Sequence, residues 1–323
     1  MKKLLKITAA VTAALLVLAV FAGCAVKVDP ANITVAALKG PTGMGLAGLM
    51  QKSAAGELDD NYEISLYAAP TDIVGLVAGG KADIAAVPSN VAATLYKKTE
   101  GKVRLIAINT LGVLYLLTKD ESIKSVKDLE GKTVVTSGQG ATPEYVTDFI
   151  LEKNGVKNCT LTYLGEHAEV VTQAVTGGAD TVLLPEPFVS TLLSKNAGFR
   201  VAIDINEEWE KVSDAALSMG VLIASKDFCE NNPEALKRFL KAYGESVSFV
   251  NEKPGEAAKV IAEYGIVASE ELAKNAIPNC NIVCITGSDM KTRIKPFLEL
   301  LHEKNAASVG GQMPDEEFYY VGS

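Results

Sequence analysis

Two similar stretches carry the polar and aromatic side chains that are best placed to bind a ligand. The first is VAGGKADIAAVPSN, residues 77–90, and the second is VTGGADTVLLPEPFVS, residues 175–190. Each contains a Gly-Gly pair that suits a helix end, then an Asp, a short apolar run and a Pro placed five residues after the Asp. The apolar runs are too short for helices and predict strands buried on both faces of a parallel sheet.

Ligands of open α/β sheets bind beyond the carboxyl ends of such strands. The candidate contacts that follow the two strands are Ser89, Asn90, Glu186 and Phe188. The alternative is that two helix-to-strand turns are alike by chance.

Two glycine-rich turns each follow a predicted strand and precede a predicted helix. GPTGMG follows the strand at 32–39, and SGQGATPE follows the strand at 133–136, with Thr142 as the expected helix N-cap. Backbone N–H groups at a helix start are unpaired and carry partial positive charge, so each turn is a candidate cradle for an anion or a dipole. The first turn is not a nucleotide-hydrolase phosphate loop, because no Gly-Lys-Ser/Thr follows. In the second turn, Gly138-Gln139-Gly140 is too weak a motif for a dinucleotide site, and no fitting acidic strand end follows. The groups expected at the mouth of the second turn are Ser137, Gln139 and the N–H groups near Ala141.

Catalytic and metal-binding patterns are sparse. Only two histidines are present, which argues against a histidine-built metal site, and His167 between Glu166 and Glu169 predicts a solvated helix start. A single histidine without a nucleophile elbow gives no basis for a Ser-His-Asp triad. Cys280 and Cys284 would share a helix face and could hold zinc, but we interpret them as buried small apolar residues. The other cysteines beyond the leader are Cys159 and Cys229, and the four predict no disulfide framework. No cofactor is expected.

The N-terminus predicts export. Residues 1–23 begin with lysines, continue with an apolar run at 7–21 and end in small residues, as signal peptides do. The next residue, Cys24, closes the sequence VFAGC, which resembles the lipobox of bacterial lipoproteins, with Phe21 where that motif more often has Leu. Lipidation of Cys24 would tether the mature protein to a membrane that it does not cross. The alternative is an ordinary cleaved signal peptide and a free cysteine.

The bulk composition fits an acidic globular protein of two domains. The chain has 323 residues, of which 48% are hydrophobic and 22% are charged. Loss of three leader lysines would change the formal charge from −8 to −11. Nucleic acid is excluded as a partner, because such binding needs a basic stripe that the sequence does not contain.

The order of the predicted elements indicates two α/β units followed by a helical region. Strands are expected at 62–67, 103–109, 113–118, 161–164, 201–203 and 216–225 in addition to those above, and the polar stretch 119–132 is interpreted as a crossover. From Asn232 onward the pattern predicts only helices, which must pack on an existing sheet. Trp209, in NEEWEK, is expected to anchor a surface helix.

The ordered set of these phrases resembles the substrate-binding proteins of bacterial ABC importers. The phrases are the lipobox, ITVAALKGPTG, GGKADIAAVPSN, SVKDLEGKTVVTSGQGATPE, GGADTVLLPEPF and GVLIASKDFCENNPEALKRFLKAY. The chain is most similar to the nitrate, sulfonate and taurine group, which also includes binders of thiamine-pyrimidine precursors. The resemblance covers about residues 30–310 and implies a type 2 periplasmic-binding fold, in which two mainly parallel α/β lobes joined by two crossovers enclose the ligand.

The resemblance also implies an organisation, a set of contacts and a set of partners. We expect a signal peptide at 1–23, a tether at 24–30, a first lobe at 31–118 plus 219–323, and a second lobe at 119–218. The partners would be a small ligand, a permease and its ATPase, and the protein would be an extracytoplasmic, lipid-anchored monomer. The implied ligand contacts are Pro41, Thr42, Gly43, Ser89, Asn90, Gln139, Ala141, Thr142, Glu186 and Phe188.

The ligand class depends on Glu186. Two helix starts favour an anionic group, whereas a cleft carboxylate repels an anion unless the ligand also carries a cationic or N–H-rich end. A taurine-like zwitterion or an aminopyrimidine meets both demands and nitrate does not. Alternatively, Glu186 is a helix-start acid that interacts with the helix dipole. Phe188 and Tyr145 could stack on a ring, or they could belong to the core. The rival function is a thiamine-pyrimidine-synthase-like enzyme, which needs a cysteine-rich motif that this sequence lacks.

Overall fold

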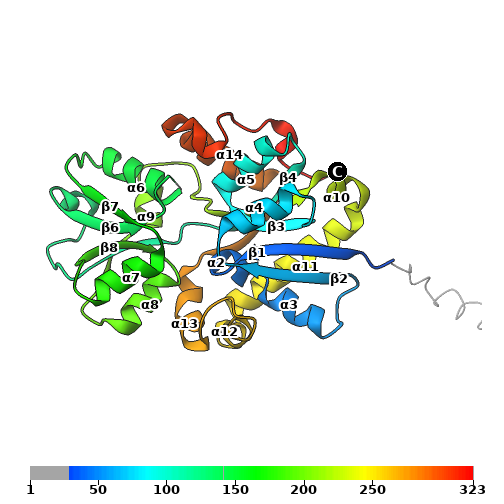
Figure 1. Cartoon of the computed structure of the whole chain (residues 1–323), viewed down its shortest axis with the longest axis horizontal. Coiled ribbons are helices and arrows are strands. Elements are labelled where there is room, and N and C mark those ends of the chain that lie inside the picture. The colour runs from blue at the N-terminus through cyan, green and yellow to red at the C-terminus, as the bar shows by residue number, and fades with distance from the viewer. Residues whose placement is uncertain (1–28, 141, 323) are drawn as a thin grey trace, which may run out of the picture.

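The structure is a computed structural model that describes residues 29–140 and 142–322, which form two α/β lobes side by side (Figure 1). The predicted leader and Cys24 lie outside the described residues, and so does the predicted ligand contact Ala141. Within the described ranges, no helix is both long enough and apolar enough to cross a membrane. The predicted two-lobed α/β fold is confirmed.

The first lobe is built on a six-stranded sheet with the order β11-β4-β10-β3-β1-β2. Strands β1, β2 and β3 are parallel, and β10 is antiparallel to both of its neighbours. Alternate residues of β1 enter opposite cores: Ala36 and Leu38 face one cluster, and Val35 and Ala37 face the other. The sheet is therefore buried on both faces. The bounds are β1 Asn32–Leu38, β2 Asn61–Tyr67, β3 Ile84–Pro88, β4 Val103–Thr110, β10 Gly220–Ser225 and β11 Ile282–Thr286.

Helices cover both faces of this sheet. Helices α4, α5 and α14 contribute to the core on one face, and α3, α10, α11, α12 and α13 to the core on the other. In α11 the buried Leu236, Phe239, Tyr243, Val247 and Val250 follow three- and four-residue spacings, which place them on one stripe of the helix. The helix bounds are α2 Pro41–Met44, α3 Ala47–Ala54, α4 Pro70–Ala78, α5 Ser89–Lys98, α10 Lys226–Asn231, α11 Pro233–Glu252, α12 Pro254–Glu263, α13 Glu270–Ala276 and α14 Gly287–Lys304, with short 3-10 turns at Ile277–Asn279, Ala306–Val309 and Glu316–Phe318.

The second lobe is built on a five-stranded sheet with the order β7-β6-β8-β5-β9. Strands β6, β7 and β8 are parallel, and β5 is antiparallel to β8. Helices α7 and α8 close one core, and α6 and α9 contribute to the core on the other face. The bounds are β5 Leu114–Thr118, β6 Thr133–Ser137, β7 Thr160–Leu164, β8 Thr181–Pro185, β9 Arg200–Asp204, α6 Thr142–Lys153, α7 His167–Val175, α8 Phe188–Lys195 and α9 Ile205–Glu210, with a 3-10 turn at Val126–Leu129.

Two features of this topology correct the sequence predictions. Strand β5 was assigned to the first lobe, but it pairs with β8 and β9 of the second, so the chain crosses at 111–113 and not after Thr118. The residues of an apolar strand do not by themselves indicate which sheet the strand joins. Strand β11 falls within the region predicted to be wholly helical, and it pairs with β4 at the sheet edge. Its place in the sheet depends on that pairing with β4, which its own five residues do not encode.

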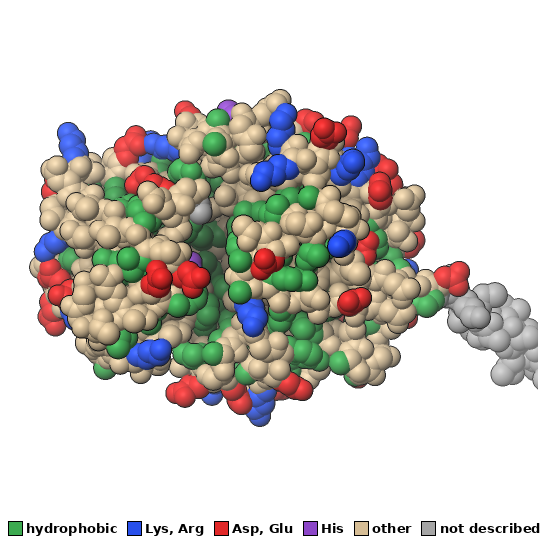
Figure 2. All heavy atoms as spheres, in the orientation of Figure 1, with side chains coloured by type: hydrophobic (Ala, Val, Ile, Leu, Met, Phe, Trp, Pro, Cys, Tyr) green, Lys and Arg blue, Asp and Glu red, His purple; other side chains and the backbone are tan. Residues whose placement is uncertain are grey.

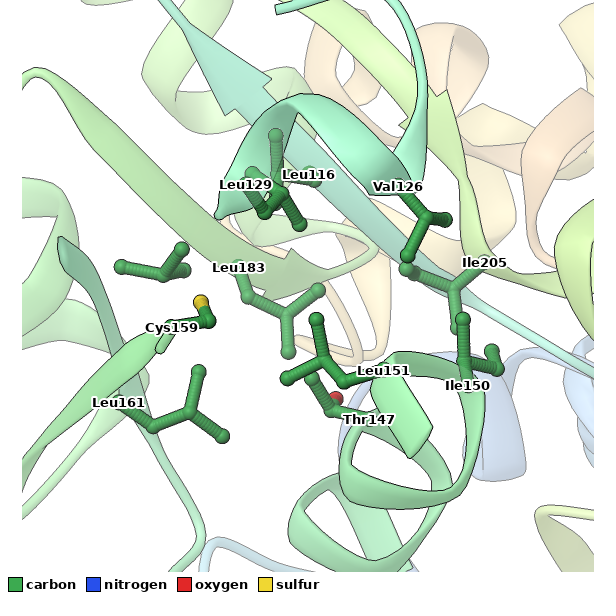
Figure 3. A pocket seen from close by; sticks show the side chains of 11 residues that line it. Leu116, Val126, Leu129, Thr147, Ile150, Leu151, Cys159, Leu161, Leu183 and Ile205 are labelled. Carbon is green, nitrogen blue, oxygen red and sulfur yellow. The ribbon is translucent and has the colours of Figure 1, made fainter. Parts of the chain in front are cut away.

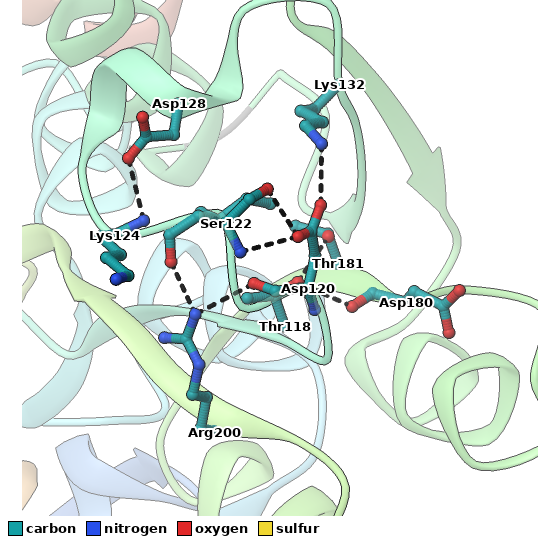
Figure 4. A network of polar contacts seen from close by, with 10 residues as sticks. Thr118, Asp120, Ser122, Lys124, Asp128, Lys132, Asp180, Thr181 and Arg200 are labelled. Carbon is teal, nitrogen blue, oxygen red and sulfur yellow. Dashed lines mark hydrogen bonds and ion pairs between the residues drawn. The ribbon is translucent and has the colours of Figure 1, made fainter.

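The polar stretch at 119–132 connects β5 to β6 within the second lobe, so its interpretation as a crossover was wrong. Figure 4 shows the contacts that hold it. The Asp120 carboxylate accepts hydrogen bonds from Lys132 Nζ at 2.7 Å and from the Ser122 N–H at 2.8 Å, and these bonds lower the pKa of Asp120. Arg200 Nη2 donates to the Asp120 carbonyl at 3.0 Å. The network lies where β5 ends and β8 begins, and it gives this connection a structural role.

The interior of the second lobe is tightly packed. A cavity of about 10 Å³ lies in this interior. Figure 3 shows the mainly aliphatic side chains that line it, among them Leu116, Leu183 and Ile205. That volume is at the lower limit for one water molecule. The half-buried Cys159 also lines it, and burial raises the pKa of this thiol to about 11. The cavity therefore offers no room for a ligand.

Helix α14 of the first lobe packs against the second lobe. The Trp209 side chain of α9 is fully buried, with its ring centroid 5.2 Å from that of Phe149 on α6 and 5.7 Å from that of Phe297 on α14. Asn305 Nδ2, just after α14, donates to the Tyr145 hydroxyl at 2.9 Å. The prediction that Trp209 anchors a surface helix was wrong, because this indole joins the two lobes.

Candidate ligand-binding site

A groove runs between the two lobes and is lined on both walls by hydrophobic side chains (Figure 2). Segments that follow β1 and β3 meet segments that follow β6 and β8 across it. The Thr142 hydroxyl donates to Asn90 Oδ1 at 3.3 Å. A Cβ atom added at Gly40 would lie 3.7 Å from Pro187 Cδ, so the turn after β1 and the turn after β8 are neighbours. The carboxyl ends of both sheets therefore face the groove, where ligands of α/β sheets bind.

The turn after β1 is closed by its own backbone. Gly40 has a φ of 87°, and its carbonyl accepts hydrogen bonds from the N–H groups of Gly43 and Met44, both at 3.0 Å. Gly43 must be a glycine, because a Cβ atom there would lie 2.4 Å from the Leu38 carbonyl oxygen. Asn109 Nδ2 donates a hydrogen bond to the Thr42 carbonyl at 3.2 Å. Pro41 and Thr42 are half-buried at the groove, but the cradle of free N–H groups predicted here is largely occupied.

The two residues that follow β3 have different environments. Ser89 is fully buried: its N–H donates to the Met219 carbonyl at 3.1 Å and its hydroxyl donates to the Ser218 carbonyl. Ser89 thus binds the segment that returns from the second lobe, and no part of its side chain is open to a ligand. Asn90 is half-buried and faces Thr142 of the second lobe.

The turn after β6 also has an N–H group that is already hydrogen-bonded within the protein. The Gly140 N–H donates to the Glu144 carboxylate, which places a negative charge at this helix start. Gln139 is exposed, and Thr142 is 3% exposed. An anionic ligand would have to compete with Glu144 here. The prediction that two helix starts favour an anion is therefore weaker than the sequence suggested.

Glu186 is 1% exposed and serves the start of α8. Its carboxylate accepts hydrogen bonds from the Ser190 N–H at 3.1 Å and from the Ser190 hydroxyl at 3.0 Å. Burial raises the pKa of the Glu186 carboxyl, and the bonds from Ser190 oppose that shift. This geometry corresponds to the helix-start interpretation, and both carboxylate oxygens are engaged within the protein.

Sequence reasoning missed a histidine at the groove end of the second lobe. His167 is half-buried, its Nδ1 is hydrogen-bonded to the Ser137 hydroxyl, and its ring centroid lies 5.1 Å from that of Phe188. Burial lowers the pKa of His167 to about 4, so the imidazole is neutral near pH 7. The prediction of a solvated helix start was wrong here. The available signal was that Ser137 directly follows the predicted strand at 133–136 and that His167 follows the next predicted strand at 161–164, because adjacent parallel strands bring their carboxyl ends together.

The cysteines form no metal site in the part of the chain that the structure describes. Among the residues that the structure describes, no group of three or more His, Cys, Asp or Glu side chains is arranged to hold a metal ion. Cys280 precedes β11 and Cys284 lies within it, so the pair is not on a helix as the zinc hypothesis required. Both are free thiols whose pKa values burial raises.

Residues 61–257 match the model of the family described as NMT1/THI5 like. The chain belongs to this family. A Brucella abortus protein named as a binding protein is 24% identical over 173 residues, which are 53% of this chain and 52% of that protein. The chain therefore aligns with about half the length of the curated relatives that it matches.

Solved structures share the fold. An ABC transporter structure from Parabacteroides distasonis has a TM-score of 0.77 at 23% identity and covers 89% of this chain and 98% of its own. The periplasmic aliphatic sulphonate binding protein SsuA from Escherichia coli has a TM-score of 0.70 at 15% identity and covers 89% of this chain and 93% of its own. At these identities the likeness establishes the two-lobed fold.

Proposed function

We propose that this NMT1/THI5-like protein is the solute-binding component of an ABC import system, and that it binds its ligand without chemical conversion. The observation that carries the proposal is the meeting of four strand-end segments, two from each lobe, across one groove. The similar Escherichia coli and Parabacteroides distasonis structures are described as a sulphonate binding protein and an ABC transporter, which supports the same role.

The mechanism is hinge closure. A ligand that contacts both lobes does so only when the lobes are together, so its binding shifts the population toward the closed form. A permease, with its ATPase, would then recognise that form. Such sites hold small ligands through a few polar groups in a mostly apolar cleft, which is the character of this groove.

The predicted contacts divide into two groups in this proposal. The residues that would touch the ligand have exposed or half-exposed surface, and those that would position them are buried. The contacts are Pro41, Thr42, Asn90, Gln139 and Phe188, with Ala141 retained from the sequence. The positioning residues are Gly43, Ser89, Thr142 and Glu186.

The ligand would be a small polar molecule of the sulfonate or taurine kind, or of the aminopyrimidine kind. We also propose that a lipid on Cys24 anchors the protein, as a monomer, outside the cytoplasm. Metabolic labelling with a radioactive fatty acid tests the anchor: label should enter the wild type and be absent from Cys24→Ala. Equal labelling of both would refute it.

Native mass spectrometry of protein purified without denaturation tests the binding function. We expect one small solute to remain bound, and we expect that solute to raise the melting temperature of the emptied protein, because binding to the folded state alone stabilises it. Phe188→Ala should weaken binding, whereas Phe199→Ala, at a buried position next to Lys119 on the same lobe, should not. Absence of any retained solute, with no thermal shift across sulfonates, amino acids, pyrimidines and amines, would overturn the proposal.

A further inference from the structure

Three side chains from separate elements meet at the groove end of the second lobe. Ser137 ends β6, His167 begins α7 and Phe188 begins α8. The Ser137 hydroxyl is bonded to His167 Nδ1, and the Phe188 ring packs on the imidazole at 5.1 Å between centroids, tilted by 48°. These residues are called the Ser137–His167–Phe188 cluster below.

The cluster presents a neutral polar group beside an aromatic one. Ser137 is 1% exposed and fixes Nδ1, so the imidazole has one orientation. Within residues 29–140 and 142–322, His167 Nε2 has no hydrogen-bond partner, and the half-buried Phe188 packs on the same imidazole ring. Burial lowers the pKa of His167 to about 4, so the ring is uncharged near pH 7 and can form one hydrogen bond with a ligand.

The surrounding groups do not favour a bound anion. The N–H groups of Gly43 and Met44 donate to the Gly40 carbonyl, and the Gly140 N–H donates to Glu144. Glu144 adds a negative charge at the groove end of α6. The cation at the end of β1 is Lys39, whose side chain is exposed, so water screens its charge. An oxoanion would therefore lose its hydration without gaining a full set of charged donors.

We propose that the Ser137–His167–Phe188 cluster determines ligand specificity, and that it takes a planar, uncharged ring with a hydrogen-bonding edge in preference to a sulfonate or other oxoanion. The ring would lie against Phe188, and its edge would bond to His167 Nε2. Offset stacking on an aromatic side chain and one oriented hydrogen bond would both stabilise a bound planar ring. The inference rests on the solute-binding function proposed above.

Two measurements test the inference on the full chain. The solute retained by the wild type is identified by mass spectrometry after extraction. Dissociation constants are then measured by calorimetry for that solute, for cytosine and nicotinamide as uncharged rings, and for taurine and ethanesulfonate as oxoanions. The variants are His167→Gln, Ser137→Ala and Lys39→Gln, with His302→Gln on α14 as the matched control.

We expect the retained solute to contain an uncharged planar ring. His167→Gln should weaken ring binding about tenfold or more and lower the ratio of ring affinity to oxoanion affinity, and Ser137→Ala should do the same to a smaller extent. A purely structural role for His167 would weaken both ligand classes equally, and that result would overturn the inference. So would an oxoanion whose binding survives His167→Gln and is lost in Lys39→Gln, and this outcome would leave the solute-binding function standing. If the retained solute is neither a planar ring nor an oxoanion, the inference fails and the solute-binding function stands; if no solute is retained and none of the tested classes binds, both proposals fail.

Discussion

The Thr142 hydroxyl donates a hydrogen bond to Asn90 Oδ1 at 3.3 Å, and the two residues belong to different lobes. Thr142 begins α6 of the second lobe, and Asn90 lies in the first turn of α5 of the first. Contacts of this kind exist only when the lobes are together. They therefore favour closure of the groove before any ligand is considered.

Loss of this bond should shift the protein toward an open form. A hydrogen bond contributes about 0.5–1.5 kcal/mol, so Asn90→Ala or Thr142→Val should raise the open-to-closed ratio by about 2- to 10-fold. Small-angle X-ray scattering of the ligand-free protein should show a larger radius of gyration. Thr147→Val is the control, because the Thr147 hydroxyl donates its hydrogen bond to the Pro143 carbonyl within α6. An unchanged radius of gyration in both groove variants would contradict a closing role.

Trp209 should report on the contact between the lobes. It is the only tryptophan of the chain, and Phe297 of the first lobe packs on it edge to face. Phe297→Ala should cost about 3–5 kcal/mol of stability and shift the Trp209 emission to longer wavelength, because water gains access to the indole. Phe239→Ala removes an equally buried ring that lies on α11, away from the second lobe. It should cost similar stability without moving the native emission maximum; an equal shift in both variants would argue against a direct contact.

Local patterns predicted the strand ends but not their partners. The runs after Asp83 and Asp180 became β3 and β8 because four buried residues, all apolar except Thr181, and a terminal Pro define such a strand by themselves. The sheet that β5 joins depends on its pairing with β8, far along the chain, and its own residues do not encode that choice. Strand β11 was missed for the same reason, since its edge position comes from β4.

The candidate site shows the same division. The sequence placed Asn90, Gln139 and Phe188 after strands, and the structure has them at strand ends beside the groove. The sequence did not indicate that the Ser89 hydroxyl donates to the Ser218 carbonyl, or that the Glu186 carboxylate accepts from Ser190. Hydrogen-bond partners of this kind depend on packing. The pairing of Ser137 with His167 needed knowledge that β6 and β7 are adjacent and in register.

The pH dependence of stability should reflect His167. Its pKa in the folded protein is about 4, below the ordinary value of 6.5, so the unfolded chain takes up the proton first as pH falls. Stability should be full above pH 6.5 and decrease, by on the order of 1–3 kcal/mol, as pH falls toward 4. Chemical denaturation across this range should show a smaller decrease in His167→Gln. In His302→Gln the free energy of unfolding should fall with decreasing pH as steeply as in the wild type. If His302→Gln loses this pH dependence and His167→Gln keeps it, His167 is not its source.

Glu186 should act through the start of α8 and not through a charge on the ligand. Burial raises its pKa, so its contribution to stability is largest below pH 4.5 and is lost as pH rises through the folded-state value. Glu186→Gln keeps an acceptor for the Ser190 N–H and removes the buried charge. At pH 8 it should leave stability unchanged or raise it by on the order of 1 kcal/mol.

Glu186→Ala should instead leave the Ser190 N–H without its partner and cost about 1–3 kcal/mol. Because Phe188 lies in the same turn, this variant should weaken ligand binding about tenfold while Glu186→Gln changes it little. Glu169→Gln is the surface counterpart, since Glu169 accepts from the Gly165 N–H at the start of α7. A selective loss of a cationic ligand in Glu186→Gln would show that the carboxylate binds the ligand directly, and would return Glu186 to the list of contacts.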